Sequence, residues 1–184
     1  HLAVDRQRIT FSPARRGGFG MGALTGVLIF AAIWIAYLLL GPMLVDVEQA
    51  RAAAEETGLA NKGLYLGLVA YWIGVNSVLE EYVYRWFLVE QGATLLDERA
   101  KRPEGPWIGA ATLSALLFTI HHIIAIKAQF GWGLTILGSA GVFVGGLIWS
   151  WIYVRYRSIW PAYLSHAIVD VAVFTVGWHI LFGV

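Results

Sequence analysis

The sequence predicts an all-α membrane protein, a polytopic transmembrane helical bundle of about five spans plus a short surface helix. Of the 184 residues, 58% are hydrophobic, and the mean hydropathy is +0.65. Only 14% are charged, against about 25% in soluble domains. The nine Trp and eight Tyr fit side chains that favour the membrane–water interface. The apolar runs approach or reach the roughly 20 residues that a spanning helix needs.

Composition also restricts the possible functions. The net charge of +1 gives no reason to expect a nucleic acid partner. The absence of cysteine excludes disulfides and cysteine-based metal sites. We expect residues 1–184 to form a single domain, because no linker or repeat divides them. Because the chain begins with His1, we expect that an N-terminal portion was removed; we expect no cleavable signal peptide, because the first apolar run is long enough to span.

The first half of the chain contains a tail, two predicted spans and a polar segment between the spans. Residues 1–20 carry four arginines and read as a basic cytoplasmic tail. A first span is predicted over residues 21–40, ending at the helix-stop pair Gly41-Pro42. Residues 46–62 predict a short surface helix. The second span begins near Gly63 and can run as far as Leu96, which makes it long and tilted.

Three further spans are predicted in the second half, after a charged loop over residues 97–105. They cover residues 107–126, 134–154 and 161–182. The fourth is rich in glycine, which lets helices pack closely. Pro161 suits the first turn of the fifth span. His166 follows only five residues later, so we expect this helix to begin in a recessed loop that lines a water-filled cavity.

Basic residues predict the orientation. Counted from the tail through the successive loops, with Arg85 assigned to the flank of the second loop, they alternate as 4-2-4-1-2-0. This alternation obeys the positive-inside rule for five spans with the N-terminus in the cytoplasm. We expect the location to be a prokaryotic cytoplasmic (inner) membrane.

Two adjacent acids interrupt the apolar second span. Glu80 and Glu81 lie within GVNSVLEEYVYRWFLV, residues 74–89. An acid at the centre of a bilayer costs roughly 2.5–3.5 kcal/mol, so an ionisable residue at this depth indicates a functional site. Asn76 and Ser77, one turn earlier, are suited to hydrogen bonds across helices.

Helical spacing sorts the other buried polar residues, because positions four apart share a face. Three such pairs occur: Glu81 and Arg85, Phe118 and His122, and His166 and Asp170. Glu80 lies about 100° around the helix from Glu81 and faces a different neighbour. Adjacent His121 and His122 are separated by the same angle, so we expect only one to face the site. The spacing to Phe118 favours His122 and leaves His121 a structural or interfacial role.

These residue types suit hydrolysis by an activated water. A carboxylate with a histidine can hold and deprotonate water, and a second imidazole can donate to a developing oxyanion. No serine or cysteine nucleophile is required. The pattern therefore predicts a polar catalytic cavity inside the bundle.

The motifs also resemble a known family. EEYVYR at residues 80–85 fits EExxxR, FTIHH at 118–122 fits FxxxH, and HAIVD at 166–170 fits HxxxN/D. In this order they are similar to the signature of the CPBP family, the CAAX-protease and bacteriocin-processing (Abi-type) glutamic intramembrane endopeptidases, which include the Ras-converting CAAX endopeptidases. The resemblance covers about residues 64–175.

The resemblance implies a role for each motif residue. Glu80 would be the general base that activates water, with His122 as its partner, while Glu81 with Arg85 would support the site. His166 and residue 170 would form the oxyanion hole. Many members have Asn at the last position. Asp170 cannot donate unless it is protonated, so here it orients His166 or keeps it charged. The implied substrate is a membrane-associated or lipidated protein or peptide in the lipid bilayer.

Two alternatives stay open. Glu80, His122 and His166 could together hold Zn²⁺ in a zinc-dependent variant of the protease. The chain has no HExxH motif, so we expect no cofactor. The second alternative is a non-catalytic membrane immunity, regulatory or transport-associated protein, since buried charges also occur in such proteins. A transporter would more naturally show repeats with broken helices.

Overall fold

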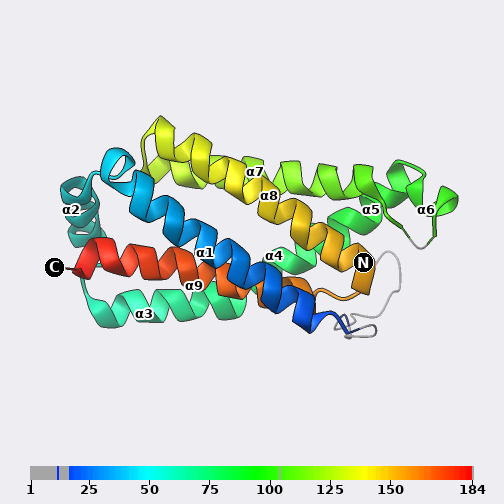
Figure 1. Cartoon of the computed structure of the whole chain (residues 1–184), viewed down its shortest axis with the longest axis horizontal. Coiled ribbons are helices and arrows are strands. Elements are labelled where there is room, and N and C mark those ends of the chain that lie inside the picture. The colour runs from blue at the N-terminus through cyan, green and yellow to red at the C-terminus, as the bar shows by residue number, and fades with distance from the viewer. Residues whose placement is uncertain (1–11, 13–16, 104, 184) are drawn as a thin grey trace, which may run out of the picture.

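The computed structural model describes residues 12, 17–103 and 105–183, and these form helices and connecting turns without a strand (Figure 1). Five helices among them are long and apolar enough to cross a membrane. The predicted all-α polytopic bundle is therefore confirmed. Most of the predicted basic tail, including its four arginines, lies outside the described residues.

The first spanning helix, α1, covers Phe19–Leu44. The prediction that it ends at Gly41-Pro42 is wrong, because Pro42 lies inside the helix. A proline this close to a helix end removes only one amide donor, and the amide of Val45 still closes the last turn on the Gly41 carbonyl at 2.9 Å. The helix stops at Val45, which is extended.

The predicted surface helix is α2, Val47–Thr57. Asp46 caps its N-terminus, with Oδ1 accepting from the amide of Gln49 at 2.9 Å. Gly58 ends it in the left-handed conformation, φ 79°, that favours glycine. Both ends are thus specified by local sequence.

The acid-bearing second span is one continuous run, Lys62–Leu95. It consists of α3 (Lys62–Tyr71), a π-helical segment η1 (Trp72–Asn76), α4 (Ser77–Glu80), a second π-helical segment η2 (Glu81–Leu88) and α5 (Val89–Leu95). Wide turns of this kind occur often at functional sites. Two carbonyls of the first π-helical segment accept hydrogen bonds from side chains. Ser77 Oγ donates to the Trp72 oxygen at 2.9 Å, and the Tyr163 hydroxyl donates to the Ile73 oxygen at 3.1 Å.

The remaining elements are α6 (Glu98–Lys101), α7 (Ile108–Gln129), α8 (Trp132–Tyr156) and α9 (Trp160–Phe182). The predicted charged loop thus contains a short helix. Glu98 in this helix accepts from the first amides of α7, at 2.9 Å from Gly109 and 3.0 Å from Ala110. A carboxylate at a helix N-terminus is favourable, and here it fixes where the third span begins.

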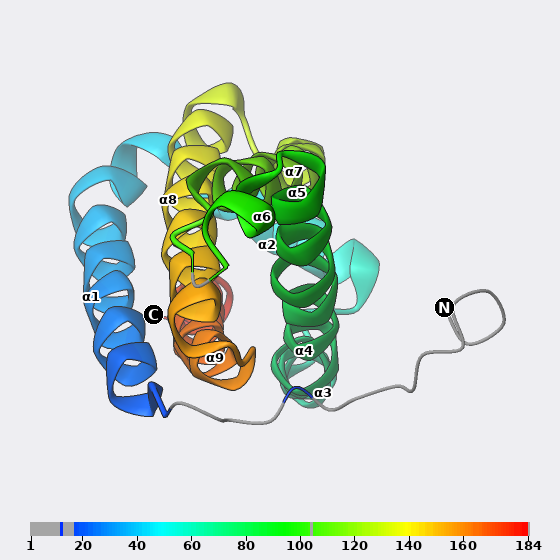
Figure 2. The ribbon, with the colours of Figure 1, turned by 90° about the vertical axis from the view of Figure 1, so that its right-hand side faces the viewer.

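Two helix pairs form the frame, α1 with α9 and α7 with α8. The long second span changes partner along its length. Its α5 and η2 segments pack against α7, whereas η1 and α4 pack against α9 (Figures 1 and 2). Glu80 and Glu81 lie at this change of partner, between the helices that carry the predicted histidines.

The start of α9 is covered by protein. Ser158, Ile159 and Pro161 are buried, and the amide of Ile159 donates to Ser12 Oγ at 3.0 Å. Helices α5 and α6 extend further along the bundle than the start of α9 does (Figure 1). This arrangement agrees with the expected recessed start and brings His166 level with Glu81.

Candidate active site

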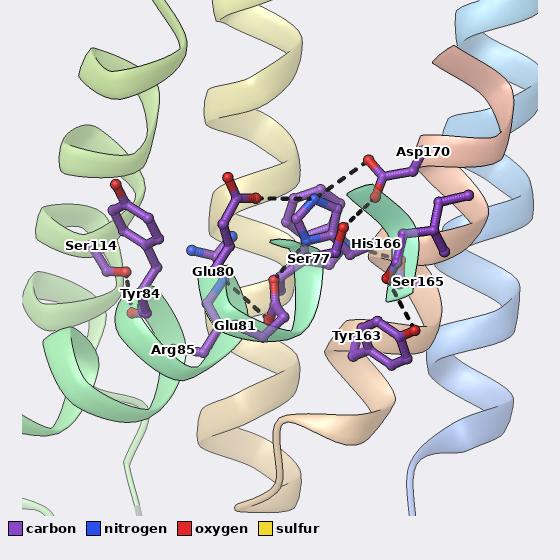
Figure 3. A network of polar contacts seen from close by, with 12 residues as sticks. Ser77, Glu80, Glu81, Tyr84, Arg85, Ser114, Tyr163, Ser165, His166 and Asp170 are labelled. Atoms are coloured by element: carbon purple, nitrogen blue, oxygen red, sulfur yellow. Dashed lines mark hydrogen bonds and ion pairs between the residues drawn. The ribbon is translucent and has the colours of Figure 1, made fainter. Parts of the chain in front are cut away.

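Glu81 is the buried centre of the polar cluster in Figure 3. Its side chain has no exposed surface, and its Oε1 lies 3.0 Å from His166 Nδ1. Its other oxygen, Oε2, lies 3.5 Å from Nε of Arg85, which is also fully buried. The spacing correctly predicts that Glu81 and Arg85 share a face, and the structure adds His166 as a second partner.

Arg85 is held by aromatic rings as well as by Glu81. Its guanidinium carbon lies 4.5 Å from the ring centre of Phe118 and 5.4 Å from that of Trp149. Cations at such distances are attracted by the ring faces. Phe118 therefore contacts Arg85 in addition to His122, and Trp149 is a site neighbour that no motif in the sequence indicated.

Glu80 lies between a histidine of α7 and one of α9, and Figure 3 shows its carboxylate directed toward His166. Its Oε1 lies 3.8 Å from His121 Nε2, and its Oε2 lies 3.7 Å from His166 Nε2. Its side chain is 12% exposed, whereas that of Glu81 is not exposed. The two adjacent acids therefore occupy different environments.

His166 lies among three carboxylates. Nδ1 faces Glu81, while Nε2 faces Glu80 and also lies 3.6 Å from Asp170 Oδ1. Only a ring that carries both protons can donate on both sides. The indole of Trp149 stacks on the imidazole, with ring centres 4.1 Å apart and 18° between the planes. Contacts on both ring nitrogens and the stacked indole together fix the orientation of this ring.

Asp170 joins α9 to the second span. Its Oδ2 is hydrogen-bonded to Ser77 Oγ, and its Oδ1 faces His166. The suggestion that Ser77 bonds across helices is thereby confirmed. Asp170 has the geometry to orient the imidazole, which is the role expected for an acid in place of Asn.

We expected His122 to face the site; in the structure His121 lies against Glu80, while His122 packs on the ring and carbonyl of Phe118. His121 faces Glu80, and its side chain is 56% exposed. His122 is partly buried, packs its ring 4.2 Å from that of Phe118, and has Nδ1 2.9 Å from the Phe118 carbonyl.

The site has a closed interior and an open rim. Glu81, Arg85 and His166 are buried, whereas Glu80, Asp170 and His121 are partly exposed. Among the residues that the structure describes, no group of three or more His, Asp or Glu side chains is arranged to hold a metal ion.

Together, these features define a multi-pass α-helical membrane protein with an intramembrane cluster of carboxylates and histidines. The family model described as "Type II CAAX prenyl endopeptidase Rce1-like" matches residues 60–172, a range that contains every predicted motif residue. The chain belongs to this family of CAAX-type intramembrane proteases. Comparison with curated proteins and with solved structures gave no match.

Proposed function

We propose that the chain is an intramembrane endopeptidase that hydrolyses a peptide bond of a membrane-anchored or lipidated protein, using a water activated by Glu80. The observation that carries the proposal is the contrast between the two acids. Glu81 is fully buried between Arg85 and His166, whereas Glu80 lies at the accessible rim beside the histidines. Family membership supports the peptidase activity.

In the proposed reaction, Glu80 removes a proton from water as the water oxygen attacks the scissile carbonyl. If Nδ1–H of His122 donates to the Phe118 carbonyl, Nε2 is left as an acceptor that can hold the same water. The carbonyl π electrons move onto oxygen and form a tetrahedral oxyanion. Collapse re-forms the carbonyl and breaks the C–N bond, while the proton on Glu80 passes to the leaving amine.

His166 stabilises the oxyanion in this proposal. Its Nε2 side faces the rim, so an N–H there can donate to the developing negative charge. Glu81 holds the opposite side of the ring at 3.0 Å. Asp170, fixed by Ser77, orients the ring. Removing one preorganised donor to an oxyanion typically costs about 10²–10³ in rate.

No metal takes part in this reaction scheme. We place the protein in a prokaryotic cytoplasmic membrane, with its N-terminus in the cytoplasm. Cleavage is expected to persist after prolonged chelation, and a loss that Zn²⁺ restores would favour the zinc-dependent alternative with Glu80, His122 and His166 as ligands.

The proposal is tested by comparing wild type with Glu80→Gln in membranes of the expressing cell, using mass spectrometry of protein termini. Glu56→Gln, on the exposed surface of α2, is the matched control. New termini should appear with wild type and with the control, and should fall by about 10²-fold or more in Glu80→Gln, because a general base contributes roughly 10²–10⁴ in rate. The same amounts of the new termini with wild type, Glu56→Gln and Glu80→Gln would contradict the proposal. If the cellular phenotype also survived Glu80→Gln and His122→Ala, a non-catalytic immunity or regulatory role would be favoured.

A further inference from the structure

Helix α1 lies outside the residues that match the family, yet it reaches the shell of the site. The match covers residues 60–172, whereas α1 ends at Leu44. The Thr25 hydroxyl of α1 hydrogen-bonds to Ser165 Oγ at 3.0 Å. Ser165 precedes His166 directly on α9 (Figure 3). A residue of α1 is thus one side chain away from a proposed catalytic residue.

Two glycines bring α1 to this position. A Cβ at Gly22 would overlap the Pro161 carbonyl oxygen, and one at Gly26 would lie 3.0 Å from the Ser165 carbonyl oxygen. Small residues four apart let helix backbones approach closely in membranes. This close approach places Thr25, between the glycines, beside Ser165.

The contact continues from Ser165 to the imidazole. The indole Nε1–H of Trp149 donates to Ser165 Oγ at 3.0 Å. The same indole stacks on His166, and both Ser165 and Trp149 are buried. Without the Ser165 acceptor the indole N–H would be buried and unsatisfied, which is unfavourable. The indole plane, and with it the face on which His166 rests, depends on this hydrogen bond.

We propose that Thr25, Ser165 and Trp149 are positioning residues through which α1 holds the His166 imidazole in its working orientation. This inference rests on the proposed function of His166, since orientation affects cleavage only if the ring takes part. The three residues do not touch the substrate in this proposal. They act through hydrogen bonds and ring stacking.

The first test measures the imidazole itself. Protein labelled with ¹⁵N-histidine is studied by NMR in detergent micelles, and the His166 signals are assigned by their loss in His166→Asn. Thr25→Val removes the hydroxyl at nearly constant volume, and Ser165→Ala removes the acceptor. Both should shift the His166 signals, and Thr25→Ser should restore them. Unchanged His166 signals in Thr25→Val and Ser165→Ala would overturn the inference.

A matched control exists on the same two helices. Trp34 Nε1 of α1 donates to Thr175 Oγ1 of α9 at 3.2 Å, away from the site. Trp34→Phe removes a hydrogen bond of the same kind between the same helices and should leave the His166 signals in place. If it shifts them as Thr25→Val does, the effect comes from general docking of α1, and the inference is wrong.

The second test measures cleavage of a farnesylated peptide with a CAAX tail and a fluorophore–quencher pair. We expect kcat to fall about 10-fold to 100-fold in Thr25→Val and Ser165→Ala with KM nearly unchanged, because small misplacements of a catalytic group have effects of this size. Glu80→Gln is run in parallel. If Glu80→Gln abolishes cleavage while the two variants keep the wild-type kcat, only the positioning inference fails. If Glu80→Gln cleaves normally, the proposed function fails. The NMR signals of His166 then still test whether α1 positions the ring.

Discussion

At the scale of single residues, the two adjacent acids differ in burial and in the partners that they contact. Glu81 touches Arg85 and His166 and has no exposed surface. A buried ion that loses its partner is strongly destabilising. Glu80 is partly exposed and contacts histidines at ion-pair distances of 3.7 and 3.8 Å. This difference in burial and contacts supports the proposed role of Glu80 as the general base.

Arg85→Met should therefore lower stability more than Glu80→Gln does. Methionine keeps much of the side-chain volume between Phe118 and Trp149 but leaves Glu81 without its cation, at an expected cost of about 3–5 kcal/mol. Glu80→Gln should change stability by less than about 1 kcal/mol. Equilibrium unfolding in detergent with increasing SDS measures both. A variant Arg85→Met that is as stable as wild type would show that the pair is not structurally important.

The two neighbouring histidines should differ in effect. His122 is partly buried, and its Nδ1 contacts the Phe118 carbonyl, whereas His121 is 56% exposed. We expect His122→Ala to reduce kcat by about 10²-fold or more, and His121→Ala by less than about 10-fold, because only a held imidazole is preorganised for water. Steady-state cleavage of the farnesylated peptide measures the ratio. The reverse order would assign the water contact to His121.

At the scale of elements, the second span forms the site by changing partner. Its C-terminal part, η2 and α5, packs on α7, and its N-terminal part, η1 and α4, packs on α9. The π-helical segments lie on both sides of Glu80. Apolar periodicity and the EExxxR spacing predict a long helix with acids on it. They do not predict the wide turns. In the first of these, Ser77 and Tyr163 bond the carbonyls of Trp72 and Ile73, and Tyr163 is brought there only by the packing of α9.

The docking of α1 on α9 gives a prediction at this scale. Gly22→Ala would place its Cβ against the Pro161 carbonyl, a backbone atom that cannot move away cheaply, whereas a Cβ at Gly20 meets nothing within 4 Å. We expect Gly22→Ala to destabilise the protein by about 1–3 kcal/mol, the usual range for overpacking. Gly20→Ala, on the same helix, should be neutral or slightly stabilising. Thermal unfolding in detergent compares them, and equal melting temperatures would contradict the close approach.

At the scale of the whole molecule, composition and apolar runs were sufficient to predict five spans and a surface helix, because the bilayer imposes their length and hydrophobicity. Motif spacing was sufficient to select which polar residues meet, as Glu81 and Arg85 show. Trp149, Ser165 and Thr25 could not be found in this way. They come from three different helices, and only tertiary packing brings them together.

The distribution of charge over the two ends of the bundle sharpens the predicted orientation. Arg85 is buried in the site, so it leaves the loop count, which becomes 4-2-3-1-2-0 and still alternates. Lysine and arginine residues of the described chain lie more densely at the α6 end than at the α2 end. The α6 end carries Arg99, Lys101, Arg102, Arg155 and Arg157, and the α2 end carries Arg51, Lys62 and Lys127.

The positive-inside rule therefore predicts that the α6 end lies in the cytoplasm. The chain contains no cysteine, so a single introduced thiol reports one position. Ala100→Cys in α6 and Glu56→Cys in α2 both replace exposed residues. A membrane-impermeant maleimide should label Glu56→Cys in intact cells and Ala100→Cys only after permeabilisation. Full labelling of both variants in permeabilised membranes controls for reactivity. Labelling of Ala100→Cys in intact cells would contradict the predicted orientation and would indicate that the N-terminus lies outside the cell.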